Sequence, residues 1–146
     1  MKRDFAFSQE LRMDHQVLPN GGRVILPEGA IDTATSEQFK NRVVSYLEDN
    51  APASALLVDL SRVKYISSVG LGALIQLMKK SRQRQSPFAL YDPQLAVRRV
   101  LEISKLDFLL VDPAGAGLFG EYVSKKEAAK AAAIPPTPSP SPKKKR

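Results

Sequence analysis

The sequence contains no cysteine, no tryptophan and a single histidine, His15. Without cysteine the chain can form no disulfide, no thiolate nucleophile and no zinc–thiolate site. The lone histidine stands among polar residues of a predicted edge strand, where we expect a solvated side chain rather than part of a catalytic relay or a metal cluster. No nucleophile–base pair is visible either. We therefore predict a protein that is not an enzyme, with no catalytic residue, no metal site and no cofactor.

Long apolar runs are also absent. No segment approaches the roughly 20 apolar residues of a membrane-spanning helix, and residues 1–9 lack the apolar stretch of a signal peptide. We therefore expect a cytoplasmic protein. Its 146 residues, 43% hydrophobic and 25% charged, suit one globular domain.

Acidic residues are scarce only at the C-terminal end. Residues 125–146 carry seven Lys or Arg side chains and one Glu, which accounts for +6 of the net charge of +7. We predict an Ala/Lys-rich helical arm over residues 124–134 and a disordered, Pro/Ser-rich basic tail over residues 135–146. The near-neutral remainder predicts no direct nucleic-acid contact by the folded domain, whereas the tail is suited to an anionic surface.

Strand and helix patterns alternate along the rest of the chain. Asn20-Gly21 predicts a hairpin turn between strands over residues 11–18 and 23–26. Asp92-Pro93 has the form of a helix cap followed by a first-turn proline. Further strands are expected over residues 55–60, 88–91 and 108–111, and helices over residues 36–47, 68–84 and 93–103. This rhythm predicts an α/β layered domain with a mixed four- to five-stranded sheet, an N-terminal hairpin and helices packed against the sheet.

Residues 56–72 are the most informative stretch. They begin as a buried strand, pass through a short polar loop and place Ser67 and Ser68 where a helix should begin. A serine at that junction either caps the helix or carries a phosphate at its positive end. The residues alone leave both roles open. The apolar positions predicted to face the core follow at helical spacing: Leu71, Leu74, Ile75 and Met78.

Two motifs resemble those of a known family. Residues 59–61 and 66–72, Asp-Leu-Ser and Ile-Ser-Ser-Val-Gly-Leu-Gly, are similar to the signature of the STAS domain, the sulfate transporter and anti-sigma factor antagonist domain. Residues 29–36 resemble the Gly-x-hydrophobic-Asp turn that precedes the family's first helix. The similarity spans about residues 11–123, so residues 1–123 are identified as a STAS domain of the anti-sigma factor antagonist type.

The resemblance implies a phosphorylation site. It places Ser68 at the family's regulatory phosphoserine, with Ser67, which stands where the family has aspartate, as the alternative acceptor. It also places Asp32 beside that serine, although the residues alone equally favour an Asx turn or a helix cap for Asp32. The expected partner-binding residues are Asp32, Thr33, Ser67, Ser68, Val69, Gly70 and Leu71.

As the resemblance implies, the unphosphorylated form binds an anti-sigma factor that is also a serine kinase of the histidine-kinase-like ATPase type. Phosphorylation at Ser68 releases the partner, and a serine phosphatase resets the switch. The ATP and magnesium belong to the partner kinase, and a monomer or weak dimer is expected. The alternatives are a stressosome-like or lipid-transport accessory scaffold, and a nucleic-acid- or membrane-binding protein directed by the tail.

Three further residues have simpler explanations. Asp59 ends a central strand, as the phosphoacceptor of a receiver domain does, but the acidic pair and late lysine of a receiver are missing, so we predict a structural turn residue. Gly70 and Gly72 lack the Lys-Ser/Thr of a nucleotide-binding loop. We expect both glycines to let the start of the helix approach a neighbouring backbone.

Overall fold

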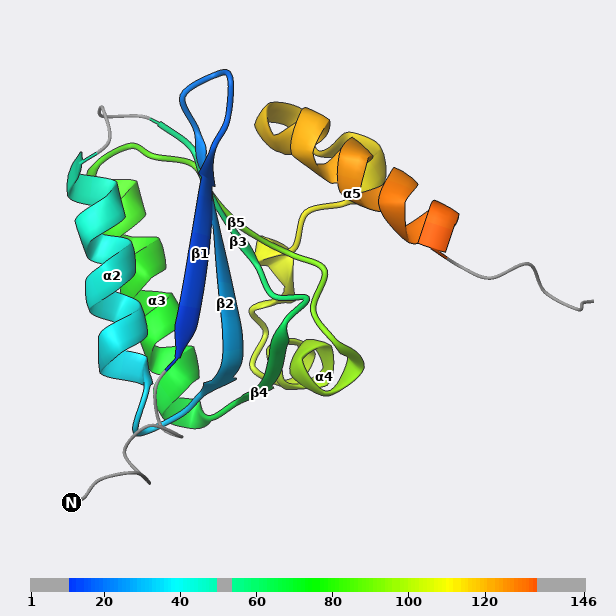
Figure 1. Cartoon of the computed structure of the whole chain (residues 1–146). Helices are drawn as coiled ribbons and strands as arrows, with labels where there is room; N and C mark the ends of the chain where they lie inside the picture. Colours follow the sequence, from blue (N-terminus) through cyan, green and yellow to red (C-terminus); the bar gives the residue numbers. More distant parts are fainter. Residues whose placement is uncertain (1–10, 50–53, 134–146) are drawn as a thin grey trace, which may run out of the picture. The chain divides into compact units, whose positions relative to one another are not determined.

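The computed structural model describes residues 11–49 and 54–133 (Figure 1). The chain divides into two compact units, Met1–Val111 and Asp112–Arg146. The predicted basic tail over residues 135–146 lies outside the described residues. None of the helices in the described part of the chain combines the length and apolar character that crossing a membrane requires.

The first unit is built on a five-stranded mixed sheet, as predicted. Four strands follow the order β1-β2-β3-β5, and β4 also pairs with β2. The first pairing is the predicted antiparallel hairpin, and the others are parallel. The strands are β1 (Arg12–Val17), β2 (Arg23–Ile31), β3 (Leu56–Asp59), β4 (Val63–Ile66) and β5 (Phe88–Tyr91).

The length of β2 explains the arrangement of the strands beside it. Its first residues, from Arg23 to Ile25, pair with β3, and its last, from Gly29 to Ile31, pair with β4. The sequence prediction ended this strand at Leu26 and treated the segment before Ser67 as a polar loop, so it missed β4. Two exposed residues separate the buried Val63 and Ile66 of β4, a pattern too short to indicate a strand by itself.

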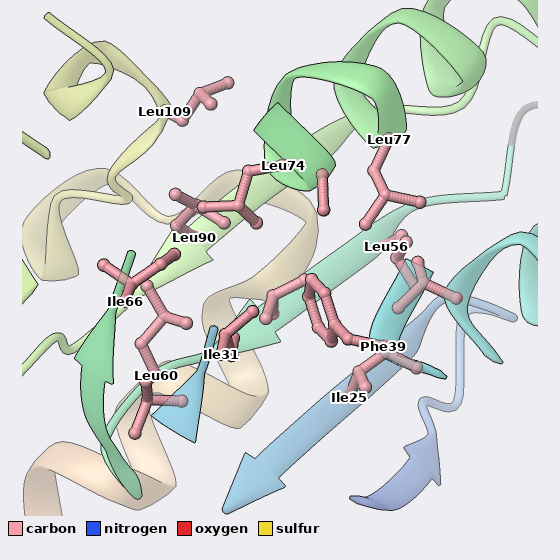
Figure 2. Packing of buried hydrophobic residues seen from close by; sticks show 14 of the residues in the cluster. Ile25, Ile31, Phe39, Leu56, Leu60, Ile66, Leu74, Leu77, Leu90 and Leu109 are labelled. Atoms are coloured by element: carbon pink, nitrogen blue, oxygen red, sulfur yellow. The ribbon is translucent and has the colours of Figure 1, made fainter. Parts of the chain in front are cut away.

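The helices of this unit are α2 (Ser36–Asp49), α3 (Ser68–Gln83) and α4 (Leu95–Ile103). Helices α2 and α3 lie side by side along the strands, and α4 lies beside β4 (Figure 1). Figure 2 shows Phe39 of α2 packed close to Ile25 and Leu56. The helix expected over residues 36–47 is confirmed, and its apolar residues at helical spacing are all buried: Phe39, Val43, Tyr46 and Leu47.

The inward face of α3 differs from the prediction. Leu74 is buried as expected, but Leu71, Ile75 and Met78 are only partly buried at the margin of the core. The most buried face instead combines two leucines with three small residues: Gly70, Ala73, Leu74, Leu77 and Ser81. A pattern of large apolar residues missed this face because small residues let the helix come close to the sheet.

Two further predictions are wrong. Residues 108–111 do not form a strand: a 3-10 turn covers Asp107–Leu109, and only an isolated bridge joins Leu110 to Leu90. Helix α4 does not begin at Asp92-Pro93 but at Leu95, with Gln94 as a cap that makes no side-chain hydrogen bond. Asp92 has a φ of 59°, so the backbone turns away from helical geometry before the helix starts.

The second unit consists of short 3-10 turns, Pro113–Gly115 and Gly117–Phe119, followed by helix α5 (Gly120–Ala133). The Asp112 carboxylate accepts a hydrogen bond of 3.0 Å from the Ala114 N–H and so caps the first turn. Helix α5 begins upstream of the predicted arm. Within it, Lys130 pairs with Glu127 at 3.0 Å, one turn away.

Candidate functional site

Strands β2 and β4 bring the two family-like motifs to one edge of the sheet. They run parallel with Ile31 opposite Ile66, so Asp32 and Ser67 are the next residues of neighbouring strands. The Ser67 N–H donates to the Ile31 carbonyl at 3.0 Å. Segments more than thirty residues apart in the sequence therefore meet where α3 begins.

Ser67 is the residue that caps α3. Its backbone is extended, with φ −90° and ψ 175°, and its hydroxyl accepts a hydrogen bond of 3.1 Å from the Gly70 N–H. The Ser67 carbonyl accepts the first helical hydrogen bond, 2.8 Å from the Leu71 N–H. The capping role that the sequence left open for Ser68 therefore belongs to its neighbour.

Ser68 is the first residue of α3, and its side chain is exposed. In the described part of the chain its hydroxyl has no hydrogen-bond partner. The following residue, Val69, is 47% exposed. The first turn contains no acidic side chain, so the positive end of the helix dipole is not neutralised locally. The hydroxyl is therefore accessible, and its surroundings favour an added anion.

Asp32 organises the turn that leads into α2. Its Oδ1 atom accepts hydrogen bonds from the Ala34 N–H at 3.0 Å and from the Thr35 N–H at 3.2 Å. The Thr35 hydroxyl in turn donates to the Ala30 carbonyl at 2.6 Å. The structure shows the Asx turn that the residues alone favoured, and a role for Asp32 in partner binding stays a prediction. Thr33 is exposed between these groups.

Gly70 and Gly72 differ in how closely neighbouring atoms approach them. A Cβ atom at Gly70 would lie against the Ile31 carbonyl oxygen and only 2.8 Å from Cγ1 of Ile66. The close approach predicted for Gly70 is confirmed, since any side chain there would push α3 away from β2. A Cβ atom at Gly72 would meet nothing within 4 Å, so the same prediction is wrong for Gly72.

Asp59 has the structural role that was predicted. It is fully buried, and its Oδ1 atom accepts a hydrogen bond of 2.9 Å from the Ser61 N–H in the turn between β3 and β4. Across residues 11–49 and 54–133, no group of three or more His, Asp or Glu side chains is arranged to hold a metal ion.

Comparison with known proteins identifies the family. Residues 14–120 match the model of the STAS domain. An 86-residue stretch is 31% identical to the anti-sigma-B factor antagonist of Listeria monocytogenes, covering 59% of this chain and 74% of that protein. The crystal structure of an anti-sigma factor antagonist from Mycobacterium paratuberculosis is 25% identical, with a TM-score of 0.62 over 70% of this chain and 84% of that one.

The fold is also that of the anti-sigma factor antagonist SpoIIAA. Its unphosphorylated form is 17% identical, with a TM-score of 0.62 over 84% of this chain and 98% of that one. Its phosphorylated form gives a TM-score of 0.56 at 16% identity, over 83% of this chain and 99% of that one. The family model, the curated relative and the shared fold agree, and the chain therefore belongs to the STAS domain family, with anti-sigma factor antagonists as its relatives.

Proposed function

We propose that this chain is an anti-sigma factor antagonist that works by partner switching. Its unphosphorylated form binds an anti-sigma factor of the histidine-kinase-like ATPase type and frees the sigma factor in the cytoplasm. The partner, using its own ATP and magnesium, phosphorylates Ser68 and is released, and a serine phosphatase restores the first form. The observation that carries the proposal is the exposed Ser68 hydroxyl at the start of α3, beside the Asp32 turn.

Ser68 suits the acceptor role better than Ser67. The Ser67 hydroxyl accepts a hydrogen bond from Gly70, and its N–H donates to Ile31. Phosphorylating Ser67 would disturb the cap and displace the start of the helix, whereas Ser68 is exposed in the first turn and its hydroxyl makes no hydrogen bond with the described residues. A kinase can therefore reach Ser68 without opening the fold.

The phosphate should act on the interface rather than on the fold. It adds about −1.5 to −2 charges, and at a helix N-terminus an anion stabilises by about 0.3–1 kcal/mol. Release must then come from the cost of burying an imperfectly paired anion against the partner. A loss of about 3 kcal/mol already weakens binding roughly a hundredfold, which is sufficient for a switch.

The test uses the purified full chain and the purified anti-sigma kinase of the same genome. With ATP and magnesium, the kinase should add one phosphate that mass spectrometry maps to Ser68. Ser68→Ala should block the reaction and keep binding, whereas Ser68→Asp should weaken binding by about a hundredfold. Ser45→Asp, the same change at an exposed position of α2, is the matched control and should bind normally. Unchanged affinity in Ser68→Asp would refute switching and favour a static scaffold.

A further inference from the structure

A groove lies between the first turns of α2 and α3, next to Ser68. Its volume is about 250 Å³, and it is lined by Ser36, Glu37, Lys40, Val69, Gly72, Ala73 and Gln76. Gly72 lies one helical turn beyond Ser68, so the two positions share a side of α3. The volume is below the roughly 300–1,000 Å³ of small-molecule sites. The groove therefore has room for one side chain of a partner rather than for a cofactor.

The packing of this chain does not require a glycine at position 72. Glycine in a helix is less favourable than alanine because it loses more backbone entropy on folding. At Gly70 the close contact with β2 explains the residue, but a Cβ atom at Gly72 would project into open space. The absence of a side chain at Gly72 keeps the groove open.

Ser36 contributes a polar group to the groove. The residue is 6% exposed and lines the groove. Its hydroxyl oxygen is not among the fully enclosed polar atoms that lack a hydrogen-bond partner in the described residues, so it is open to the solvent in the groove. An occupant of the groove can replace that solvent with a direct hydrogen bond to the hydroxyl.

The lining defines the chemistry of that occupant. Val69, which is 47% exposed, and Ala73 form an apolar wall. The Ser36 hydroxyl and the Gln76 amide offer hydrogen bonds, while Glu37 and Lys40 pair with each other at 3.6 Å. An apolar body with a hydrogen-bonding tip fits this lining, and tyrosine is the side chain of that kind that is enriched at protein interfaces.

We propose that the groove is a specificity subsite that receives a tyrosine side chain of the anti-sigma factor seated over Ser68. This inference rests on the proposed function. The groove is continuous with the face that carries the proposed phosphoacceptor, so a partner that reaches the Ser68 hydroxyl also covers the groove. Side chains that fill such pockets at the centre of an interface contribute much of the binding free energy.

The test measures stability and affinity for the purified anti-sigma kinase together. Gly72→Ala should raise the melting temperature by about 2–4 °C and yet weaken binding about tenfold, and Gly72→Gln should weaken it further because its side chain fills more of the groove. Ser36→Ala should also weaken binding about tenfold at an unchanged melting temperature. The matched control is Gly120→Ala, at the first residue of α5, where a Cβ atom would also meet nothing within 4 Å; it should leave the affinity unchanged.

The outcomes separate this inference from the proposed function. If the wild-type chain binds the kinase and the Gly72 and Ser36 variants bind equally well, the subsite is wrong and the switch stands. If the variants change the oligomeric state of the protein in solution but not its affinity for the kinase, the groove is a contact with a second copy of the chain, and the proposal is overturned. If the wild-type chain does not bind the kinase, both the proposed function and the subsite are wrong.

Discussion

The two glycines of the Gly70-Leu71-Gly72 segment should respond to the same substitution with opposite signs. In Gly70→Ala the new methyl group would lie against the Ile31 carbonyl oxygen, 2.8 Å from Cγ1 of Ile66 and 3.0 Å from Cγ2 of Ile31. The carbonyl cannot move freely, because it accepts the hydrogen bond of 3.0 Å from the Ser67 N–H. The start of α3 must therefore shift away from β2.

The magnitudes follow from these contacts. Overpacking of this kind costs about 1–3 kcal/mol, and weakening the Ser67–Ile31 hydrogen bond adds about 0.5–1.5 kcal/mol. Alanine is more favourable than glycine in a helix, and this offsets about 0.5–1 kcal/mol of the loss. Together these contributions predict that Gly70→Ala lowers the free energy of unfolding by about 0.5–4 kcal/mol. Gly72→Ala gains the same preference without a clash, so it should raise the free energy of unfolding by about 0.5–1 kcal/mol.

Urea unfolding of the two variants and the wild type measures both changes, and an unchanged slope with denaturant would show that the unfolded states are comparable. Equal stability of Gly70→Ala and wild type would refute the close contact between α3 and β2. A loss of stability in Gly72→Ala would show that the groove is already filled by the protein itself.

Three more predictions concern the cap of α3, the Asp32 turn and the C-terminal tail. Ser67→Ala should lower the free energy of unfolding by about 1 kcal/mol because it removes the cap, whereas Ser68→Ala should leave it unchanged in the same urea titration; the reverse order would mean that Ser68 is the cap. Asp32→Ala should lower the free energy of unfolding by about 1–2 kcal/mol. Asp32→Asn keeps an acceptor at Oδ1 and should have a melting temperature close to that of the wild type. A slower phosphorylation of Asp32→Asn in a kinase assay would therefore reflect the lost charge alone. Deleting residues 135–146 should not change the melting temperature, since that proline-rich segment has few apolar side chains to bury; a fall of several degrees would contradict this.

Features set by neighbouring residues could be predicted from the sequence. The hairpin follows from Asn20-Gly21: Gly21 has a φ of 88°, and the Asn20 side chain accepts a hydrogen bond of 2.9 Å from the Gly22 N–H. The inward stripe of α2 follows from helical spacing, because four apolar residues recur on one face of the helix. The turn role of Asp59 follows in the same way, since its partner is two residues away. These features depend on contacts that lie within a few residues of each other.

Other features depend on contacts between distant segments, and only the tertiary structure decided them. Strand β4 exists because the end of β2 offers it free hydrogen-bonding groups, which the sequence of β4 does not reveal. Ser67 rather than Ser68 caps α3 because the Ser67 N–H is fixed to Ile31, and this sets where the helix begins. Gly70 and Gly72 look alike in the sequence, but only one of them faces a neighbouring strand. The motif therefore determined that a serine lies at the start of a helix, and the pairing of β2 with β4 determined which serine is exposed.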